Sequence, residues 1–404
     1  MPVASKANRN DIPGSRQIAR RMLAATALGQ FLGMTLWFSA TAAAPAIAAD
    51  LSLTPSATAW LTMAVQAGFV AGTLASALLN LADVLNARRL FAAGCVAGAL
   101  ANAAIAYASG PGQAIALRFA TGAALACIYP PGMKIAAGWF AERRGTALGV
   151  LVGALTIGSA FPHLLAWGAR TVPWRVLLAV SSSLAVLGGA IVLAVVRDGP
   201  YVTASAPFDP RAALEAIRNR GVRLATLGYL GHMWELYAMW TWMPAFAAAS
   251  IAAGGGAPGR TGSLVAFVAI ASGAAGCVLA GLWADAWGKA RIAGLAMVVS
   301  AASAASAALV FGGSPALLFL LAVVWGFSVV ADSAQFSALV SEFSPRTHVG
   351  TALTLQTCAG FLLTLVTLRG LPLVADAVGW RWAFWVLVPG PVLGAFAMRR
   401  LGRP

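Results

Sequence analysis

Twelve apolar segments, each about 20 or more residues long, follow one another along the chain and are separated by short polar turns. A helix needs about 20 apolar residues to cross the hydrocarbon core of a bilayer. The segments are residues 22–47, 57–81, 88–108, 112–139, 144–168, 172–196, 222–250, 261–287, 289–311, 314–342, 347–374 and 379–400. This pattern predicts an all-α membrane protein with twelve transmembrane helices.

A polar stretch at residues 197–221 divides the segments into two sets of six. It contains three prolines and a short basic amphipathic piece, so we expect a cytoplasmic linker that is partly helical. The predicted organisation is a basic cytoplasmic tail at 1–21, a six-helix bundle at 22–196, the linker at 197–221 and a second six-helix bundle at 222–404.

The positions of the basic residues predict the orientation. If the N-terminus lies inside, 20 of the 27 Lys and Arg fall in inside segments and five in outside segments, while Arg118 and Lys134 lie within an apolar segment. The positive-inside rule then places both termini in the cytoplasm of a multi-pass protein in the inner (plasma) membrane. The formal charge of +15 is explained by these loops, and 60% hydrophobic against 10% charged residues argues for a bilayer and against nucleic acid as the partner.

The two halves carry matching sequences at a nearly constant spacing. Gly145-Thr-Ala-Leu returns at Gly350-Thr-Ala-Leu, 205 residues later, and Trp174-Arg returns at Trp380-Arg, 206 residues later. Several such matches in the same order indicate a duplication, so we expect two bundles related by a pseudo-twofold axis.

One loop between apolar segments reads Gly281-Leu-Trp-Ala-Asp285-Ala-Trp-Gly288-Lys289-Ala-Arg291, and a weaker copy surrounds Asp83. This pattern resembles the loop signature of the major facilitator superfamily of secondary transporters. The resemblance covers nearly the whole chain, and it implies the twelve-helix fold of that family and a central cavity between two rocking halves. It also implies a gating role for residues at the inner ends of the helices: Asp83, Asp285, Gly281, Gly288, Arg143, Arg144 and Arg346. The expected ion pairs join Asp83 to Arg143 or Arg144, and Asp285 to Arg346.

The fourth and fifth segments carry a second set of family features. They contain Arg118-Phe-Ala-Thr-Gly, Tyr129-Pro-Pro-Gly and a Trp-Phe…Arg-Arg-Gly ending at Gly145, which resemble the branches that carry small organic or inorganic anions. Arg118 is expected either to bind an anionic substrate or to form a structural ion pair, with Tyr129 three turns further on the same face. Lys134 is a substrate-binding candidate, or its side chain snorkels to the headgroups.

Carboxylates inside apolar segments are costly and therefore usually functional. Glu235 is expected near the membrane midplane with His232 on the same helix face, where the two either exchange protons or form a structural hydrogen bond. Asp332 is expected to carry a proton or to be the counter-ion of Arg118 or Lys134. Further substrate-binding candidates are Gln335, Tyr237, Trp240 and Trp37, whereas Gln30, Gln66, Gln356 and His163 are expected to serve in packing.

The sequence contains no Walker loop, no GxSxG and no HExxH, and only three histidines. We therefore expect no enzyme, no cofactor and no metal site. The four cysteines lie in apolar segments without a CxxC pair and are expected to be inert buried thiols.

The prediction is a secondary active transporter that moves a small polar solute, most simply an organic anion, by alternating access coupled to an ion gradient, with H⁺ as the expected ion. We expect it to be a monomer. The alternative is a proton-coupled drug or cation efflux pump, because two intramembrane carboxylates and an aromatic seventh helix would suit an amphipathic cation. A receptor or scaffold with a transporter fold is a third alternative.

Overall fold

The computed structural model describes residues 15–140, 144–168, 173–201, 218–257, 259–345 and 348–402, and every regular element in these ranges is a helix. Ten of the described helical spans are long and apolar enough to cross a membrane. The all-α fold predicted from the apolar segments is therefore confirmed.

The first half contains the helices up to residue 195. They are α1 (Ser15–Met34), α2 (Ser39–Ala42), α3 (Ala44–Asp50), α4 (Pro55–Leu78), α5 (Leu81–Val84), α6 (Ala87–Ala104), η2 (Ile105–Tyr107), α7 (Pro111–Leu125), α8 (Tyr129–Trp139), α9 (Arg144–Gly168) and α10 (Trp174–Val195). Consecutive long helices run in opposite directions, because short turns join them.

The second half contains the helices from residue 220 onward. They are α12 (Arg220–Ala253), α13 (Thr261–Trp287), α14 (Lys289–Val310), α15 (Pro315–Ala331), α16 (Ser333–Phe343), α17 (Val349–Val378), α18 (Trp380–Ala383), η3 (Phe384–Leu387) and α19 (Pro389–Leu401). Most of the expected linker, residues 202–217, lies outside the described residues, as do residues 1–14 of the expected tail.

The two predicted spans that are not among the ten begin the two halves. The first is interrupted after Met34, where residues 35–38 form a turn before α2. The seventh, α12, is continuous over 34 residues but carries His232, Glu235 and several aromatic residues. The hydropathy of α1 is lowered by Arg16, Arg20 and Arg21 at its beginning, and that of α12 by its polar side chains, which in a membrane helix point to a functional site.

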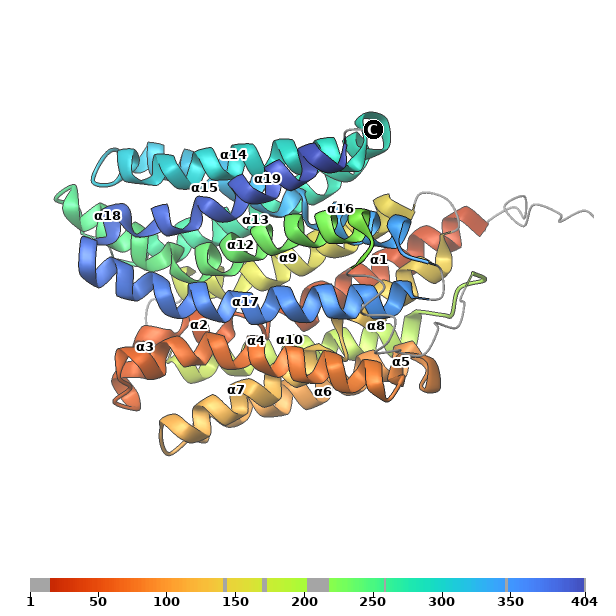
Figure 1. The fold of residues 1–404 in the computed structure, drawn as a ribbon. Coiled ribbons are helices and arrows are strands. Elements are labelled where there is room, and N and C mark those ends of the chain that lie inside the picture. The colour runs from red at the N-terminus through yellow and green to blue at the C-terminus, as the bar shows by residue number, and fades with distance from the viewer. Residues whose placement is uncertain are drawn as a thin grey trace, which may run out of the picture.

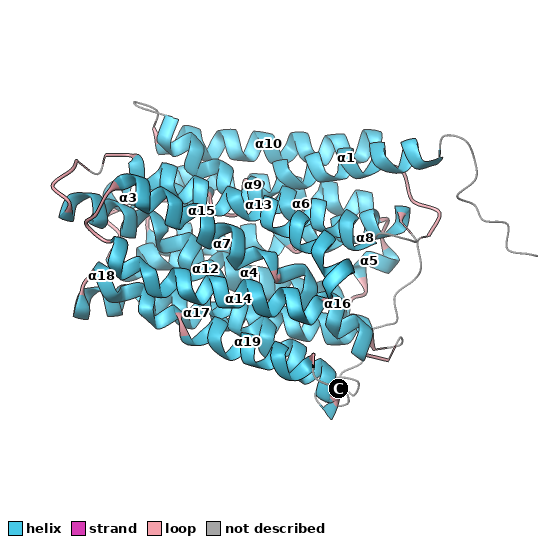
Figure 2. Cartoon of the chain, turned by 90° about the horizontal axis from the view of Figure 1, so that it is seen from above, coloured by secondary structure: helices cyan, strands magenta, loops and turns pink. Residues whose placement is uncertain are grey.

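The halves lie side by side with their long helices roughly parallel (Figures 1 and 2). Helix α9 packs along α13, and α4 packs along α17, so that four helices form the boundary between the halves. The beginning of α1, α5, α16 and the C-terminus lie at one end of the bundle, and α3 and α18 lie at the opposite end (Figure 1). We call the end at which α1 begins the basic end, because it carries Arg16, Arg20, Arg88, Arg220 and Arg399.

One helix in each half is broken near its middle. The helix formed by α7 and α8 is broken before Tyr129, where Pro130 and Pro131 cannot donate backbone hydrogen bonds. The helix formed by α15 and α16 is broken at Asp332, 203 residues after Tyr129 (332 − 129), which matches the offset of the sequence repeat. In transporters, discontinuous helices of this kind surround substrate sites. The breaks therefore mark the middle of the molecule as the place to look for a site.

Close helix contacts occur within the halves and looser ones between them. A Cβ added at Gly122 of α7 would lie 2.1 Å from the carbonyl oxygen of Val65 on α4, within the first half. A Cβ added at Gly153 of α9 would lie 3.4 Å from the carbonyl oxygen of Ala274 on α13, across the boundary. The glycines thus lock helices together inside a half and leave room between halves, as rocking of rigid halves requires.

We expect Gly122→Ala to lower the free energy of unfolding by about 1–3 kcal/mol, because the methyl group overpacks a backbone contact. Gly153→Ala is the matched control and is expected to be neutral or slightly stabilising, since alanine favours helix more than glycine does. Thermal unfolding of the two purified variants in detergent measures both effects. An equal loss of stability in both would contradict the difference between the two kinds of contact.

Candidate functional site

Six aromatic residues meet across the boundary between the halves. We call them the aromatic layer: Trp37, Phe38, Phe69, Tyr237, Trp240 and Phe361. The ring centroids of Trp37 and Tyr237, from opposite halves, lie 5.6 Å apart, and those of Phe69 and Phe361 lie 4.6 Å apart. Because all six side chains are buried, they fill the middle of the boundary with flat apolar faces. Three of the predicted site residues, Trp37, Tyr237 and Trp240, are thereby brought together.

Arg118 is fully buried and donates to main-chain oxygens of α4 and of the interruption of the first helix. Its Nε donates to the carbonyl of Leu61 at 2.9 Å, and its Nη atoms donate to the carbonyls of Leu36 at 3.1 Å and Trp37 at 2.5 Å. Nη1 also lies 3.3 Å from Oδ1 of Asn102. Carbonyls freed by a helix interruption need donors in a membrane. In this conformation Arg118 supplies donors for the carbonyls of Leu36 and Trp37. The partners of Arg118 that the structure describes are therefore neutral oxygens and do not include a carboxylate.

His232 and Asp332 form a buried pair in the second half. Nδ1 of His232 on α12 lies 2.7 Å from Oδ1 of Asp332, and both side chains are at most 3% exposed. Asp332 lies at the break between α15 and α16, where Sγ of Cys277 on α13 donates to the carbonyl of Val330 at 3.5 Å. The helix break thus brings the carboxylate to the face of α12. The alternatives that paired Asp332 with Arg118 or Lys134 do not describe this conformation.

The hydrogen-bond partners described for Glu235 do not include His232, although the two residues are only three positions apart on α12. Its Oε1 accepts from Nε1 of Trp325 at 2.5 Å, and its Oε2 accepts from Oγ of Ser300 at 2.8 Å. Both donors come from helices inside the second half, α15 and α14. Glu235 therefore has a donor for each oxygen, and the hydrogen bond to His232 that its spacing allowed is not formed.

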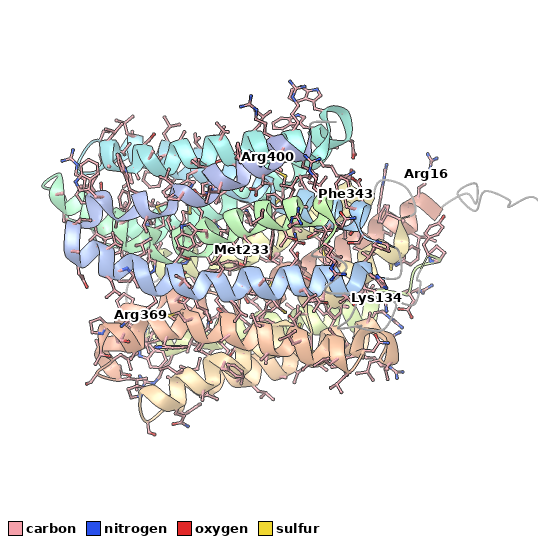
Figure 3. The ribbon with its side chains drawn as sticks, in the orientation of Figure 1. Arg16, Lys134, Met233, Phe343, Arg369 and Arg400 are labelled. Atoms are coloured by element: carbon pink, nitrogen blue, oxygen red, sulfur yellow. The ribbon has the colours of Figure 1, made fainter. Side chains whose placement is uncertain are left out.

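The predicted residues of the broken helices lie at different depths. Tyr129 begins α8 and packs against the buried core cluster that contains Tyr229 and Tyr237 of the other half. Met233 of α12, next to His232, lies near the middle of the molecule, whereas Lys134 lies toward the basic end (Figure 3). Gln335 is buried on α16, one turn from Asp332. Tyr129 thus joins the middle of the boundary, and Lys134 does not.

Buried polar atoms without a partner gather near the aromatic layer. In the part of the chain that the structure describes, such atoms include those of Gln30, Gln66, His163 and Gln356, the indole nitrogens of Trp37 and Trp240, and the hydroxyl oxygens of Thr73, Ser181 and Thr241. The ring of His163 packs 6.0 Å from that of Phe38. We expected the glutamines and His163 to serve in packing, but most buried polar groups in native proteins are hydrogen-bonded, so a cluster of exceptions indicates a missing partner.

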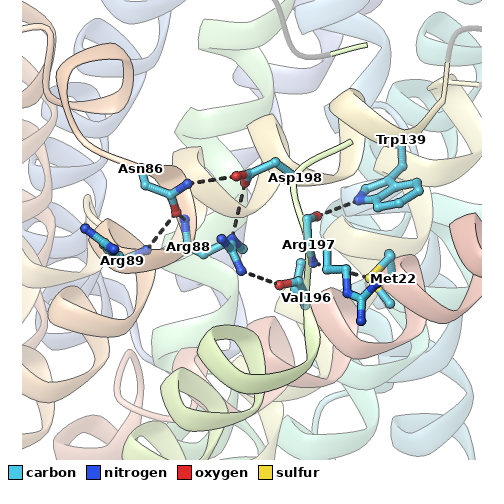
Figure 4. Close-up of polar contacts among 8 residues, drawn as sticks. All are labelled: Met22, Asn86, Arg88, Arg89, Trp139, Val196, Arg197 and Asp198. Carbon is cyan, nitrogen blue, oxygen red and sulfur yellow. Dashed lines mark hydrogen bonds and ion pairs between the residues drawn. The ribbon is translucent and has the colours of Figure 1, made fainter. Parts of the chain in front are cut away.

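At the basic end of the first half, the loop after α5 is tied to the end of α10 (Figure 4). Nε of Arg88 lies 3.2 Å from Oδ1 of Asp198, and Nη1 of Arg88 donates to the carbonyl of Val196 at 2.7 Å. Nδ2 of Asn86 donates to Oδ2 of Asp198 at 2.9 Å. These contacts close this end of the first half on itself.

The loop between α13 and α14 has a similar contact in the second half. Gly288 has a φ of +89°, the region that favours glycine, and Lys289 beside it pairs with Glu342 of α16. Gly281 is buried near Gly145 across the boundary, and Asp285 is exposed. Four other predicted gating groups cannot be placed: Arg143 and Arg346 lie outside the described residues, as do the side chains of Asp83 and Arg144.

Several residues of this region were not among the predicted site residues. Phe69 and Phe361 give no signal in the sequence, because a phenylalanine in an apolar helix is ordinary. Ser300 and Trp325 bind Glu235 from helices whose position the sequence does not give. Asn102 could have been noticed, since an amide in an apolar segment is costly unless it has partners.

Comparison with known proteins agrees with this architecture. A hexuronate transporter of Escherichia coli (strain K12) is 30% identical over 166 residues, which are 40% of this chain and 38% of that protein. A hexuronate transporter of Escherichia coli O157:H7 matches to the same extent. The match therefore spans well under half the length of these relatives.

Two solved structures share the fold over nearly their whole length. The proton:xylose symporter XylE, bound to 6-bromo-6-deoxy-D-glucose, has a TM-score of 0.74 at 13% identity and covers 96% of each chain. The nucleoside transporter NupG has a TM-score of 0.70 at 14% identity and covers 95% of this chain and 100% of its own. At such low identity, the likeness concerns the fold alone.

The family model described as Major Facilitator Superfamily matches residues 26–255 and 251–404, which together span most of the chain. The first match covers the first half and continues through α12, and the second covers the remaining helices of the second half. The ten long apolar helices identify a multi-pass membrane protein, and the family match identifies it as a transporter rather than an enzyme. The resemblance found in the loop sequences is confirmed, and this chain belongs to the Major Facilitator Superfamily of secondary transporters.

Proposed function

We propose that this protein carries a small organic anion together with a proton across the inner membrane, with both termini in the cytoplasm. The observation that carries the proposal is the contact of 2.7 Å between His232 and Asp332, buried at a helix break near the boundary of the halves. An ionisable pair in this position is expensive in a membrane and is usually retained for function. The partial match to a hexuronate transporter supports an anion as the solute.

The coupling between proton binding and anion binding follows from the charge of the His232–Asp332 pair. With a neutral imidazole and an ionised Asp332, the pair carries one negative charge; with one added proton, on either residue, its net charge is zero. An anion between the halves is repelled by the first state and not by the second, and this difference is large where little water screens it. Proton binding and anion binding therefore favour each other, which is the requirement for symport.

The groups around the pair support Asp332 rather than Glu235 as the proton carrier. Among the described residues, the ring of Tyr229 on α12 lies 6.0 Å from that of His232, and Cys277 on α13 donates to the carbonyl of Val330, two residues before Asp332. Both oxygens of Glu235 already accept from Ser300 and Trp325. Nε2 of His232, in contrast, is buried without a partner, so it is available to accept or release a proton.

The movement proposed for transport is rocking of the two halves about the aromatic layer. The layer closes the boundary in this conformation, because its rings come from both halves and contact one another. Opening toward one side separates Trp37 from Tyr237 and exposes the polar groups nearby. The contacts at the basic end, Arg88 with Asp198 and Lys289 with Glu342, lie within single halves, so they stiffen each half during this motion.

The test is uptake of radiolabelled D-glucuronate into proteoliposomes with an imposed pH gradient. We expect uptake against a concentration gradient when the outside is acidic, and tighter anion binding to the purified protein as the pH falls from 8 to 6. A proton-coupled cation exporter would show the opposite sign, because protonation then disfavours the solute. Glucuronate uptake that is unaffected by the pH gradient would exclude proton coupling.

A further inference from the structure

We infer that the space between the halves binds a ring that bears several hydroxyl groups and one carboxylate, that is, a monosaccharide acid. This inference names the substrate class of the proposed transporter and therefore rests on the proposed function. It is based on the buried donor and acceptor atoms around the aromatic layer that have no hydrogen-bond partner.

Besides the His232–Asp332 pair and the hydroxyl groups of Thr73, Ser181 and Thr241, which can both donate and accept, six nitrogen-bearing side chains near the layer have buried atoms without a partner. These atoms are Nε2 and Oε1 of Gln30 and of Gln66, Nε2 of Gln356, Nδ1 and Nε2 of His163, and Nε1 of Trp37 and of Trp240. The side chains are at most 3% exposed, and both halves contribute. A buried group without a hydrogen bond destabilises a protein. Their clustering therefore indicates that a polar solute is their partner during transport.

The numbers of donors and acceptors among these atoms indicate which solute could form hydrogen bonds with all of them. Three amide nitrogens, two indole nitrogens and one imidazole nitrogen are donors, six in all, whereas two amide oxygens and the other imidazole nitrogen are acceptors, three in all. The solute must accept more hydrogen bonds than it donates, yet it must donate several. Hydroxyl groups do both, and a carboxylate adds acceptors only. A polyhydroxylated carboxylate matches this balance.

Other solutes match it less well. A small carboxylate without hydroxyl groups leaves the oxygens of Gln30 and Gln66 unpaired, because an ionised carboxylate has no donor. An amphipathic cation has few acceptors and leaves the six donors unpaired. The polar groups and the substrate must pair almost completely, because unpaired groups in a closed site cost affinity.

The arrangement of the groups also suits a ring. Three of them lie close to the aromatic layer along the chain: Gln66 is three residues from Phe69 on α4, Gln356 is five residues from Phe361 on α17, and Gln30 of α1 is seven residues before Trp37, which lies in the turn after α1. The rings of the layer provide flat apolar faces on which the C–H face of a pyranose packs, with its hydroxyl groups directed outward. Binding sites of this kind combine apolar walls with a few placed polar groups.

Three ligands that share a six-membered ring separate the parts of the inference. They are D-glucuronate, which has hydroxyl groups and a carboxylate, D-glucose, which lacks the carboxylate, and cyclohexanecarboxylate, which lacks the hydroxyl groups. Their affinities for the full-length purified protein are measured by isothermal titration calorimetry at pH 6. We expect D-glucuronate to bind at least about tenfold more tightly than either of the others.

The other possible results distinguish a failure of this inference from a failure of the proposed anion transport. If cyclohexanecarboxylate binds as tightly as D-glucuronate, the hydroxyl part of the inference is overturned while the proposed anion transport stands. If D-glucose binds as tightly, the hydroxyl part is supported and the proposed anion specificity fails. If none of the three binds, the inference is overturned.

Gln66→Met tests the hydrogen-bonding role directly, because methionine has nearly the shape of glutamine and no polar amide. We expect D-glucuronate affinity to fall about 10- to 100-fold. We also expect the ligand-free variant to be at least as stable as the native protein in thermal unfolding, since an unpaired buried amide is removed.

The control is Gln113→Met, because Gln113 is exposed and bonds Ser109 at the end of the bundle far from the basic end. It is expected to leave glucuronate affinity unchanged. If Gln66→Met binds normally, or if it loses stability together with affinity, Gln66 serves in packing and the inference is wrong at this position.

Discussion

Replacing Asp332 with asparagine is expected to abolish the pH dependence of anion binding and the accumulation of anion driven by a proton gradient. Asparagine keeps the size of the side chain and its contact with Nδ1 of His232, but it removes the negative charge that attracts the added proton, so the buried pair is expected to stay neutral between pH 8 and pH 6. Coupling between two binding events is typically worth a factor of about 5–150 in affinity. The ratio of glucuronate affinities at pH 6 and pH 8 should therefore fall from such a factor to about one.

The matched control is Glu235→Gln, which changes the other buried carboxylate of the second half. Its oxygens accept from Trp325 and Ser300, and the amide nitrogen of glutamine can only donate, so one of these hydrogen bonds is lost. We expect about 1–3 kcal/mol less stability and a preserved ratio of affinities between pH 6 and pH 8. If Glu235→Gln abolishes the ratio and Asp332→Asn preserves it, the assignment of the proton carrier must be exchanged.

The architecture was predictable because the solvent imposes it. A chain in a bilayer must satisfy its main-chain groups within helices, so apolar segments of about 20 residues indicate spans without any knowledge of packing. The break before Tyr129 follows from two prolines that the sequence displays. The equivalent break at Asp332 has no proline, and it was not visible in the sequence.

The partners of the ionisable side chains were less predictable. Helical spacing predicts that His232 and Glu235 lie on one face of α12, but it does not give the partner of either side chain. Their partners, however, come from α14, α15 and the break before α16, whose rotation about their own axes depends on the whole of the second half. The glutamines near the aromatic layer illustrate the same limit, because spacing along one helix does not tell whether a neighbouring helix offers a partner.

These contacts also assign different tasks to the two halves. Among the described residues near the middle, the carboxylates belong to the second half, and the first half contributes Gln30, Gln66, His163 and the donor-rich interruption around Arg118. Proton binding is thus expected to change the charge of one half while the other contributes mainly neutral contacts to the solute. Rigid halves that move against each other connect the two events.

Arg118→Met is expected to cause the largest loss of stability among the variants considered, about 3–5 kcal/mol in the free energy of unfolding. The substitution leaves the carbonyls of Leu36, Trp37 and Leu61 without the donor that Arg118 provides, in a region from which water is excluded. Arg118→Lys should recover only part of the loss, because an ammonium group lacks the planar fork that reaches several oxygens at once. Thermal unfolding in detergent gives both values.

An exposed arginine with similar contacts provides the control. Arg175 pairs with Asp50 at 2.8 Å and donates to the carbonyl of Ala106, but its side chain is 50% exposed. Arg175→Met is expected to cost about 1 kcal/mol or less, because water replaces the lost contacts. If Arg118→Met instead keeps the native stability and loses only glucuronate binding, Arg118 contacts the anion in another conformation. Its bonds to the first helix would then be those of the closed state, released when the halves move apart.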